Sequence, residues 1–167
     1  MQGRFLPTFL LAFLLVTAPP LAANIVNSPT ILIINSYNPE YAWTKNQYDG
    51  IMHELENLGR EYLVFTEYLD WKRYPSQDNL KLMHDLCKSK YRNKEIDLII
   101  TTDDAAFRFA LDNRVELFSD APVIFAGVYR EIAAEMMKGQ MRVTGVYQDL
   151  DIDSTIRCAI GINPRID

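Results

Sequence analysis

The sequence predicts an α/β protein with a doubly wound, mainly parallel sheet and helices on both of its faces. Two observations support this fold class. Apolar runs typical of strands alternate with helical patterns from residue 30 onward, and the first, third and fourth runs are continuously apolar. Strict alternation of strand and helix implies right-handed crossovers between parallel strands. A continuous apolar run is typical of a strand that is buried on both faces.

Five strands are expected from these runs, and the fifth is the weakest. The first reads TILIIN, the third DLIIT and the fourth PVIFA, with Gly127 expected to end the fourth. The expected ranges are Thr30–Asn35, Tyr62–Tyr68, Asp97–Thr101, Pro122–Ala126 and Val143–Tyr147.

The helices are predicted from apolar residues at helical spacing and from start and stop signals. The first helix is expected to be capped by Thr44 and stopped by Gly59, and the second is expected to start at Pro75-Ser76. Asp103 is the expected cap of a third helix, Ala105–Leu111, and a fourth is expected from about Glu131 to Lys138. A last helix is expected to be capped by Asp153 or Ser154 and ended by Gly161 and Pro164. The second helix is expected to turn Leu80, Met83, Leu86 and Cys87 inward. Cys87 and Cys158 both fall in helical segments, so two buried free thiols are expected rather than a disulfide.

The first 23 residues have the pattern of a secretory signal peptide. Arg4 supplies a positive charge, Phe5–Ala18 is apolar, and Leu21-Ala22-Ala23 offers small residues for cleavage. The apolar run is short for a bilayer span, which needs about 20 residues. An exported protein is therefore expected, periplasmic or on the extracytoplasmic face of the membrane, with residues 24–29 as a linker. Retention of the segment as an anchor stays open, because Leu21 is not the ideal small residue.

Composition and motifs argue against several function classes. Acidic residues outnumber basic ones by 22 to 17, without a Lys/Arg cluster, which argues against nucleic acid as a partner. The sequence has no nucleophile elbow, phosphate-binding loop or dinucleotide fingerprint, so no catalytic machinery and no cofactor are expected. A metal site is not expected at His53 and His84, which lie on separate helices. Nor is one expected at Asp149–Asp153, because Ser154 and Ile160 stand where a calcium loop needs Gly and Glu.

Ligands of an open α/β sheet bind outside the carboxyl ends of the strands, near the switch in strand order. That rule selects three loops: Ser36–Trp43, Thr101–Asp104 and Ala126–Tyr129. The candidate ligand-binding residues in and beside them are Ser36, Tyr37, Tyr41, Trp43, Thr102, Asp103, Asp104, Gly127 and Val128.

These candidates also have structural interpretations. Asp103 and Asp104 either contact a ligand, such as an ammonium group, or serve the start of a helix as cap and first-turn acid. A ligand role is favoured for Ser36 and Tyr37, and packing of the loop is favoured for Trp43. Gly127 allows close approach of a ligand, or simply permits a turn.

The order of these residues is similar to that of a known family. The runs Ile31–Trp43, Glu67–Pro75, Asp97–Phe109 and Ala121–Val128 resemble extracytoplasmic sensor domains related to the substrate-binding proteins of ABC transporters. The resemblance implies a type I periplasmic-binding fold, in which two α/β lobes close over a small polar or aromatic solute. Such domains sit at the N-terminus of membrane-anchored histidine kinases or diguanylate cyclases, and related proteins are the binding components of ABC importers.

By this resemblance, residues 30–148 are the first lobe and residues 149–167 are a crossover and helix that lead to a second lobe. The chain is accordingly expected to be an N-terminal fragment. The implied hinge residues are Gly145, Gln148, Asp149 and Asp151. The expected partner is a membrane-embedded output module, with an ABC permease as the alternative. A flavodoxin-like or hydrolase-like enzyme that uses the Asp103/Asp104 loop is a more remote alternative, with Ser36 as its candidate nucleophile.

Overall fold

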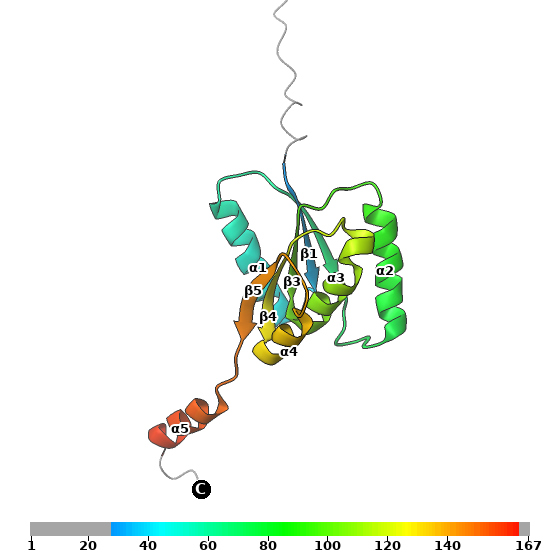
Figure 1. Cartoon of the computed structure of the whole chain (residues 1–167). Helices are drawn as coiled ribbons and strands as arrows, with labels where there is room; N and C mark the ends of the chain where they lie inside the picture. Colours follow the sequence, from blue (N-terminus) through cyan, green and yellow to red (C-terminus); the bar gives the residue numbers. More distant parts are fainter. Residues whose placement is uncertain (1–27, 164–167) are drawn as a thin grey trace, which may run out of the picture.

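The computed structural model describes residues 28–163, so the predicted signal peptide, most of the predicted linker and Pro164 lie outside the described residues. Five parallel strands form one sheet in the order β2-β1-β3-β4-β5, which confirms the predicted α/β class (Figure 1). The strands are β1 (Thr30–Asn35), β2 (Leu63–Tyr68), β3 (Leu98–Thr102), β4 (Val123–Tyr129) and β5 (Val143–Gln148). Each lies within a few residues of its predicted range.

A helix follows every strand. The helices are α1 (Ala42–Asn57), α2 (Gln77–Tyr91), α3 (Asp103–Leu117), α4 (Arg130–Met136) and α5 (Ile152–Ile162). Figure 1 shows α1 on one face of the sheet, and α2, α3 and α4 on the other. No helix in the described part of the chain combines the length and the apolar character needed to cross a membrane.

The pleat of β1 divides the core into two clusters. Leu32 and Ile34 point toward α2 and α3, where they join Phe107 and Phe125, whereas Ile31 and Ile33 point toward α1. These four side chains of β1 are each at most 2% exposed. The strand is therefore buried on both faces, as its continuous apolar sequence predicts.

The face of β4 and β5 on the α1 side is only partly covered by the described residues. Ile124 is 37% exposed and Val146 is 69% exposed. The α5 helix does not cover this face, because all of its described residues are exposed and it lies apart from the sheet (Figure 1). The prediction that both faces are covered is therefore right for β1 and β3 and wrong for this edge.

Three predicted caps are wrong. Thr44 lies inside α1 and is buried, because Oδ1 of Asn38 accepts from the backbone of Glu40 and Tyr41 at 3.1 Å and turns the chain into the helix earlier. Asp103 does not cap α3, since its carboxylate points toward α1. The side chain of Asp151 caps α5 by accepting from the backbone N–H of Ser154 at 2.9 Å, in place of the predicted Asp153 or Ser154.

The predictions for α2 and for the cysteines are mostly confirmed. Ser76 caps α2 by accepting from the backbone N–H of Asn79 at 3.2 Å, and Cys87 is fully buried. Leu86 is 42% exposed, so it does not face inward. Both cysteines are free, but Cys158 is exposed because α5 packs against no described element. Burial raises the pKa of Cys87 to about 12, which makes it an unreactive thiol.

Candidate functional site

The switch in strand order lies between β1 and β3, because the chain runs from β1 to β2 on one side and returns to β3 on the other. In the register of the sheet Asn35 pairs with Thr102, and Thr102 pairs with Ala126. The three loops that follow these strands therefore begin at the same edge. A pocket with a volume of about 250 Å³ lies there, lined by Tyr37, Tyr41, Trp43, Lys72, Asp103, Asp104, Gly127, Tyr129 and Gln148.

Asp103 is the most buried charged group of this pocket, at 5% exposure. Its backbone has a φ of 62°, which directs the side chain back toward α1. Oδ1 accepts from the indole Nε1 of Trp43 at 2.9 Å, and the Gln47 amide, oriented with its nitrogen toward the carboxylate, donates to Oδ2 at 3.3 Å. Burial raises the pKa of Asp103 from 3.8 to about 6, against the opposing effect of the Trp43 hydrogen bond.

Asp104 brings a second carboxylate to the same edge. Burial also raises its pKa, while a hydrogen bond from the backbone of Tyr129 lowers it. Its Oδ1 is buried and has no hydrogen-bond partner among the described residues. The negative charge of this side chain is therefore only partly compensated within the fold.

Tyrosines form one wall of the pocket. The rings of Tyr37 and Tyr41 are 5.6 Å apart and nearly perpendicular. Burial raises the pKa of the Tyr37 hydroxyl, and the charges of Asp103 and Asp104 raise it further. The Tyr37 hydroxyl is therefore neutral at physiological pH and sits in a negative electrostatic field.

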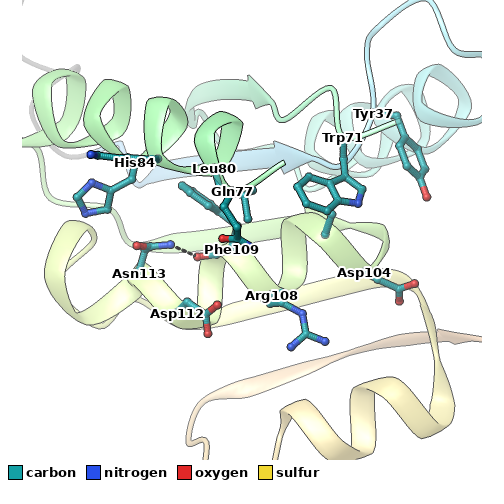
Figure 2. Close-up of a pocket in the computed structure, with 12 residues that line it drawn as sticks. Tyr37, Trp71, Gln77, Leu80, His84, Asp104, Arg108, Phe109, Asp112 and Asn113 are labelled. Carbon is teal, nitrogen blue, oxygen red and sulfur yellow. Dashed lines mark hydrogen bonds between the residues drawn. The ribbon is translucent and has the colours of Figure 1, made fainter. Parts of the chain in front are cut away.

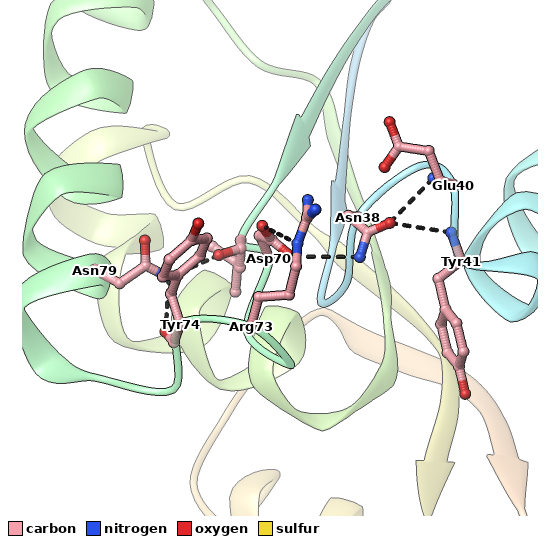
Figure 3. Close-up of polar contacts among 8 residues, drawn as sticks. Asn38, Glu40, Tyr41, Asp70, Arg73, Tyr74 and Asn79 are labelled. Atoms are coloured by element: carbon pink, nitrogen blue, oxygen red, sulfur yellow. Dashed lines mark hydrogen bonds and ion pairs between the residues drawn. The ribbon is translucent and has the colours of Figure 1, made fainter.

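The loop between β2 and α2 brings the single basic residue of the pocket lining, Lys72. Its Nζ donates to the hydroxyl of Tyr41 at 2.9 Å and lies 4.1 Å from the centre of that ring. Figure 3 shows how the two neighbouring loops are joined: Asn38 Nδ2 donates to Asp70 Oδ1 at 3.4 Å, and Arg73 Nε donates to both oxygens of Asp70 at 2.8 Å.

Gly127 lets β4 approach α1 and α3 closely. The glycine has a φ of 73° and sits at a β-bulge between Ala126 and Val128, so β4 continues past it to Tyr129 rather than ending there as predicted. A Cβ atom at this position would lie 2.6 Å from the Gln47 amide and 3.0 Å from Asp103 Oδ1. The bulge therefore depends on a residue without a side chain.

The other candidates are buried behind the pocket. Ser36 Oγ donates to the Thr102 carbonyl at 2.6 Å and accepts from the backbone N–H of Ala106 at 2.8 Å. The Thr102 hydroxyl donates to Asn35 at 3.1 Å, and Val128 is fully buried. The Ser36 and Thr102 side chains join β1, β3 and α3, and none of the three candidates lines the pocket.

Three lining residues were not among the predicted ligand contacts: Lys72, Tyr129 and Gln148. Gln148 was expected to be a hinge residue. Tyr129 could have been found, since it is the last residue of a loop that the sequence had already selected. Lys72 had no such signal, because its place in the pocket depends on β2 lying next to β1.

The predicted hinge residues have structural contacts of their own. Asp149 forms an ion pair with Arg130 at 2.7 Å, and Asp151 caps α5. Gly145 lies within β5 against the ring of Phe125. Of the four, Gln148 alone lines the pocket.

Replacing Gly145 by alanine is expected to destabilise the fold by about 1–3 kcal/mol, the usual cost of overpacking. A Cβ atom there would lie 2.1 Å from the Phe125 carbonyl oxygen and 2.5 Å from its ring, so β4 and β5 would have to separate. Urea denaturation followed by circular dichroism measures the effect. Gly50→Ala is the control, because nothing lies within 4 Å of a Cβ atom at that helical position. Equal stability of the two variants would contradict the close approach of β5 to β4.

A larger hollow of about 620 Å³ lies beside the pocket, between α2 and α3, and shares Tyr37 and Asp104 with it. Figure 2 shows Leu80 and His84 of α2 facing Phe109 and Asn113 of α3 across this hollow. Its lining comes mostly from two helix surfaces rather than from strand ends. The smaller pocket is the stronger candidate, because it lies where α/β sheets bind ligands.

The pocket is lined by charged, aromatic and amide groups. Within residues 28–163, no group of three His, Cys, Asp or Glu side chains is placed to hold a metal ion. Ser36 has its hydroxyl engaged with two backbone groups, and both histidines lie outside the pocket lining. What the pocket offers a ligand is carboxylate charge, aromatic surface and the amide of Gln148.

No protein-family model matches this chain, and comparisons with curated proteins and with solved structures found no significant match.

Proposed function

We propose that this domain binds a small solute at the carboxyl edge of its sheet and is the first lobe of an extracytoplasmic sensor or binding protein. The observation that carries the proposal is the pocket itself. The pocket is lined by residues from the ends of β1, β3, β4 and β5, and it contains the buried carboxylate of Asp103. Burying a charged group at the carboxyl edge of the sheet costs free energy of folding, and such groups cluster at functional sites.

The exposed apolar side of α5 supports the two-lobe part of the proposal. Ile152 is 64% exposed, Ile156 is 53% exposed and Ile160 is 47% exposed, at the spacing of one helix face. Such a face normally packs against another element. We propose that it packs within a second lobe, that residues 149–151 form the hinge, and that hinge closure over the solute transmits binding to a membrane-embedded output module.

A thermal-shift screen of small solutes, followed by titration with Trp fluorescence, tests solute binding. A solute that raises the melting temperature is expected to bind at least about tenfold more weakly to Asp104→Asn, because a carboxylate facing the ligand is lost. Asp112→Asn is the matched control, since Asp112 is exposed and lines only the hollow between α2 and α3. Because Asp104 also borders that hollow, loss of binding in Asp112→Asn, with or without a loss in Asp104→Asn, would place the site in the hollow and overturn the assignment.

A further inference from the structure

The aromatic wall of the pocket already holds an ammonium group, which belongs to Lys72. Its Nζ lies 4.1 Å from the ring centre of Tyr41 and 5.8 Å from that of Tyr37. Both distances are within the range of about 6 Å over which an aromatic face attracts a cation. The wall therefore provides a surface that binds an ammonium group.

The loop that carries Lys72 is held from both sides. The backbone N–H of Trp71 donates to the Ser36 carbonyl at 2.8 Å, and Asp70 adopts a φ of 50° while its carboxylate binds Arg73 and Asn38 (Figure 3). These contacts fix the backbone on either side of Lys72. The loop therefore holds Lys72 at a place from which its side chain reaches the ring of Tyr41.

Acidic groups outnumber basic ones along the pocket. Asp103 and Asp104 both line it, and Lys72 is the single basic residue among the lining residues. The ammonium of Lys72 contacts tyrosines, and no ion pair joins it to an acidic side chain within residues 28–163. Arg130, the first residue of α4, is paired with Asp149. Arg108 on α3 offsets part of the charge of Asp104. The charge of Asp103 and the remaining charge of Asp104 are accordingly available to a ligand.

We propose that the solute is a small organic cation whose ammonium group takes the place of the Lys72 ammonium on the ring of Tyr41, beside the carboxylates of Asp103 and Asp104. This inference rests on the proposed function and names the class of its ligand. Lys72 then acts as an internal competitor: it occupies the aromatic wall of the empty pocket and swings out toward solvent, where its side chain is already exposed, when the ligand enters. The volume of about 250 Å³ suits a compact amine.

The effect of Lys72 on affinity has opposite signs for the two charge classes of ligand. For a cation, Lys72 is both a competitor and a like charge, so its removal strengthens binding. For an anion, Lys72 is the attractive partner, so its removal weakens binding. The sign of the change therefore identifies the ligand class.

The test compares three probes with the same carbon chain: n-butylammonium, 1-butanol and butyrate. Each is titrated into the purified chain and followed by nuclear magnetic resonance, with wild type, Lys72→Met and Lys81→Met in parallel. Lys81 is an exposed lysine that lines the neighbouring hollow, and it controls for a change in net charge. We expect n-butylammonium to bind best and Lys72→Met to tighten its binding about three- to tenfold, the range given by loss of one cation–π contact. We expect no such change in Lys81→Met.

Weaker binding of n-butylammonium to Lys72→Met than to wild type, or preferential binding of butyrate, would overturn the proposal. So would equal tightening in both lysine variants, which would indicate a general charge effect. If none of the three probes binds while a neutral or anionic solute binds in an Asp104-dependent way, the cation assignment fails and the proposed function stands. If no solute depends on Asp104, the proposed function fails as well.

Discussion

Replacing Phe125 by alanine is expected to lower the free energy of unfolding by about 3–5 kcal/mol, as for other large core side chains. Phe125 is fully buried on β4, with its ring 4.7 Å from that of Phe107 and 5.3 Å from that of Tyr147. Truncation removes both ring contacts and leaves a cavity between the sheet and α3. Because Gly145 packs directly on Phe125, the cavity also loosens the pairing of β5.

The neighbouring residue on β4 provides the control. Ile124 points to the opposite face and is 37% exposed, so Ile124→Ala is expected to cost only about 1 kcal/mol or less. Urea denaturation followed by far-ultraviolet circular dichroism compares the two variants. A comparable loss of stability in both would contradict the asymmetry of β4 and would mean that its second face is covered in solution.

The strands could be predicted from the sequence because burial on both faces leaves a continuous apolar run. TILIIN marks β1 to the residue, and DLIIT marks β3 to within one residue at each end. The helix starts were harder, because several polar residues near each start are able to cap it. Asp103 has a good capping side chain, but its carboxylate accepts instead from the indole N–H of Trp43 on α1. That competition depends on contacts between distant segments.

Part of the candidate site could also be predicted from the sequence. The rule that ligands bind at the carboxyl ends of strands selected Tyr37, Tyr41, Trp43, Asp103, Asp104 and Gly127, and all six line the pocket. The rule did not distinguish these six residues from Ser36, which does not line the pocket because its hydroxyl joins the backbone of β3 and α3. It also missed Lys72, because the order of the strands decides which loops are neighbours. Exposure of Cys158 was missed because a helical apolar pattern does not specify which element it packs against.

Replacing Asp103 by asparagine is expected to stabilise the protein at neutral pH by about 1–3 kcal/mol. Burial raises the pKa of Asp103 to about 6, above the ordinary value of 3.8 that applies to the unfolded chain. The fold therefore favours the protonated form, and the wild type loses stability as the pH rises from about 4 to about 6. At about 1.4 kcal/mol per pH unit, the full loss approaches 3 kcal/mol. Asparagine stays neutral and avoids it.

The Asp103→Asn substitution tests the effect of the negative charge alone. Asparagine has nearly the same shape, tolerates the positive φ at this position, and keeps an oxygen that accepts from Trp43. The groups that face Asp103 are Trp43 and Gln47 from α1, Asp104 from its own helix and Gly127 from β4, so the only other charge beside it is also negative. Its ionisation is therefore opposed by burial and by Asp104, and no cation of the described fold compensates it at close range.

Urea denaturation at pH 4 and at pH 7.5 measures the prediction. The stability difference between Asp103→Asn and wild type should be largest at pH 7.5 and should nearly vanish at pH 4, whereas exposed Asp112→Asn should show little difference at either. A variant that is less stable than wild type at pH 7.5 would mean that the carboxylate contributes to the fold through Trp43. A stabilised variant that also binds n-butylammonium more weakly would show that the charge costs stability and serves the ligand. That combination is expected of a functional group, because stabilising a strained or charged site commonly costs function.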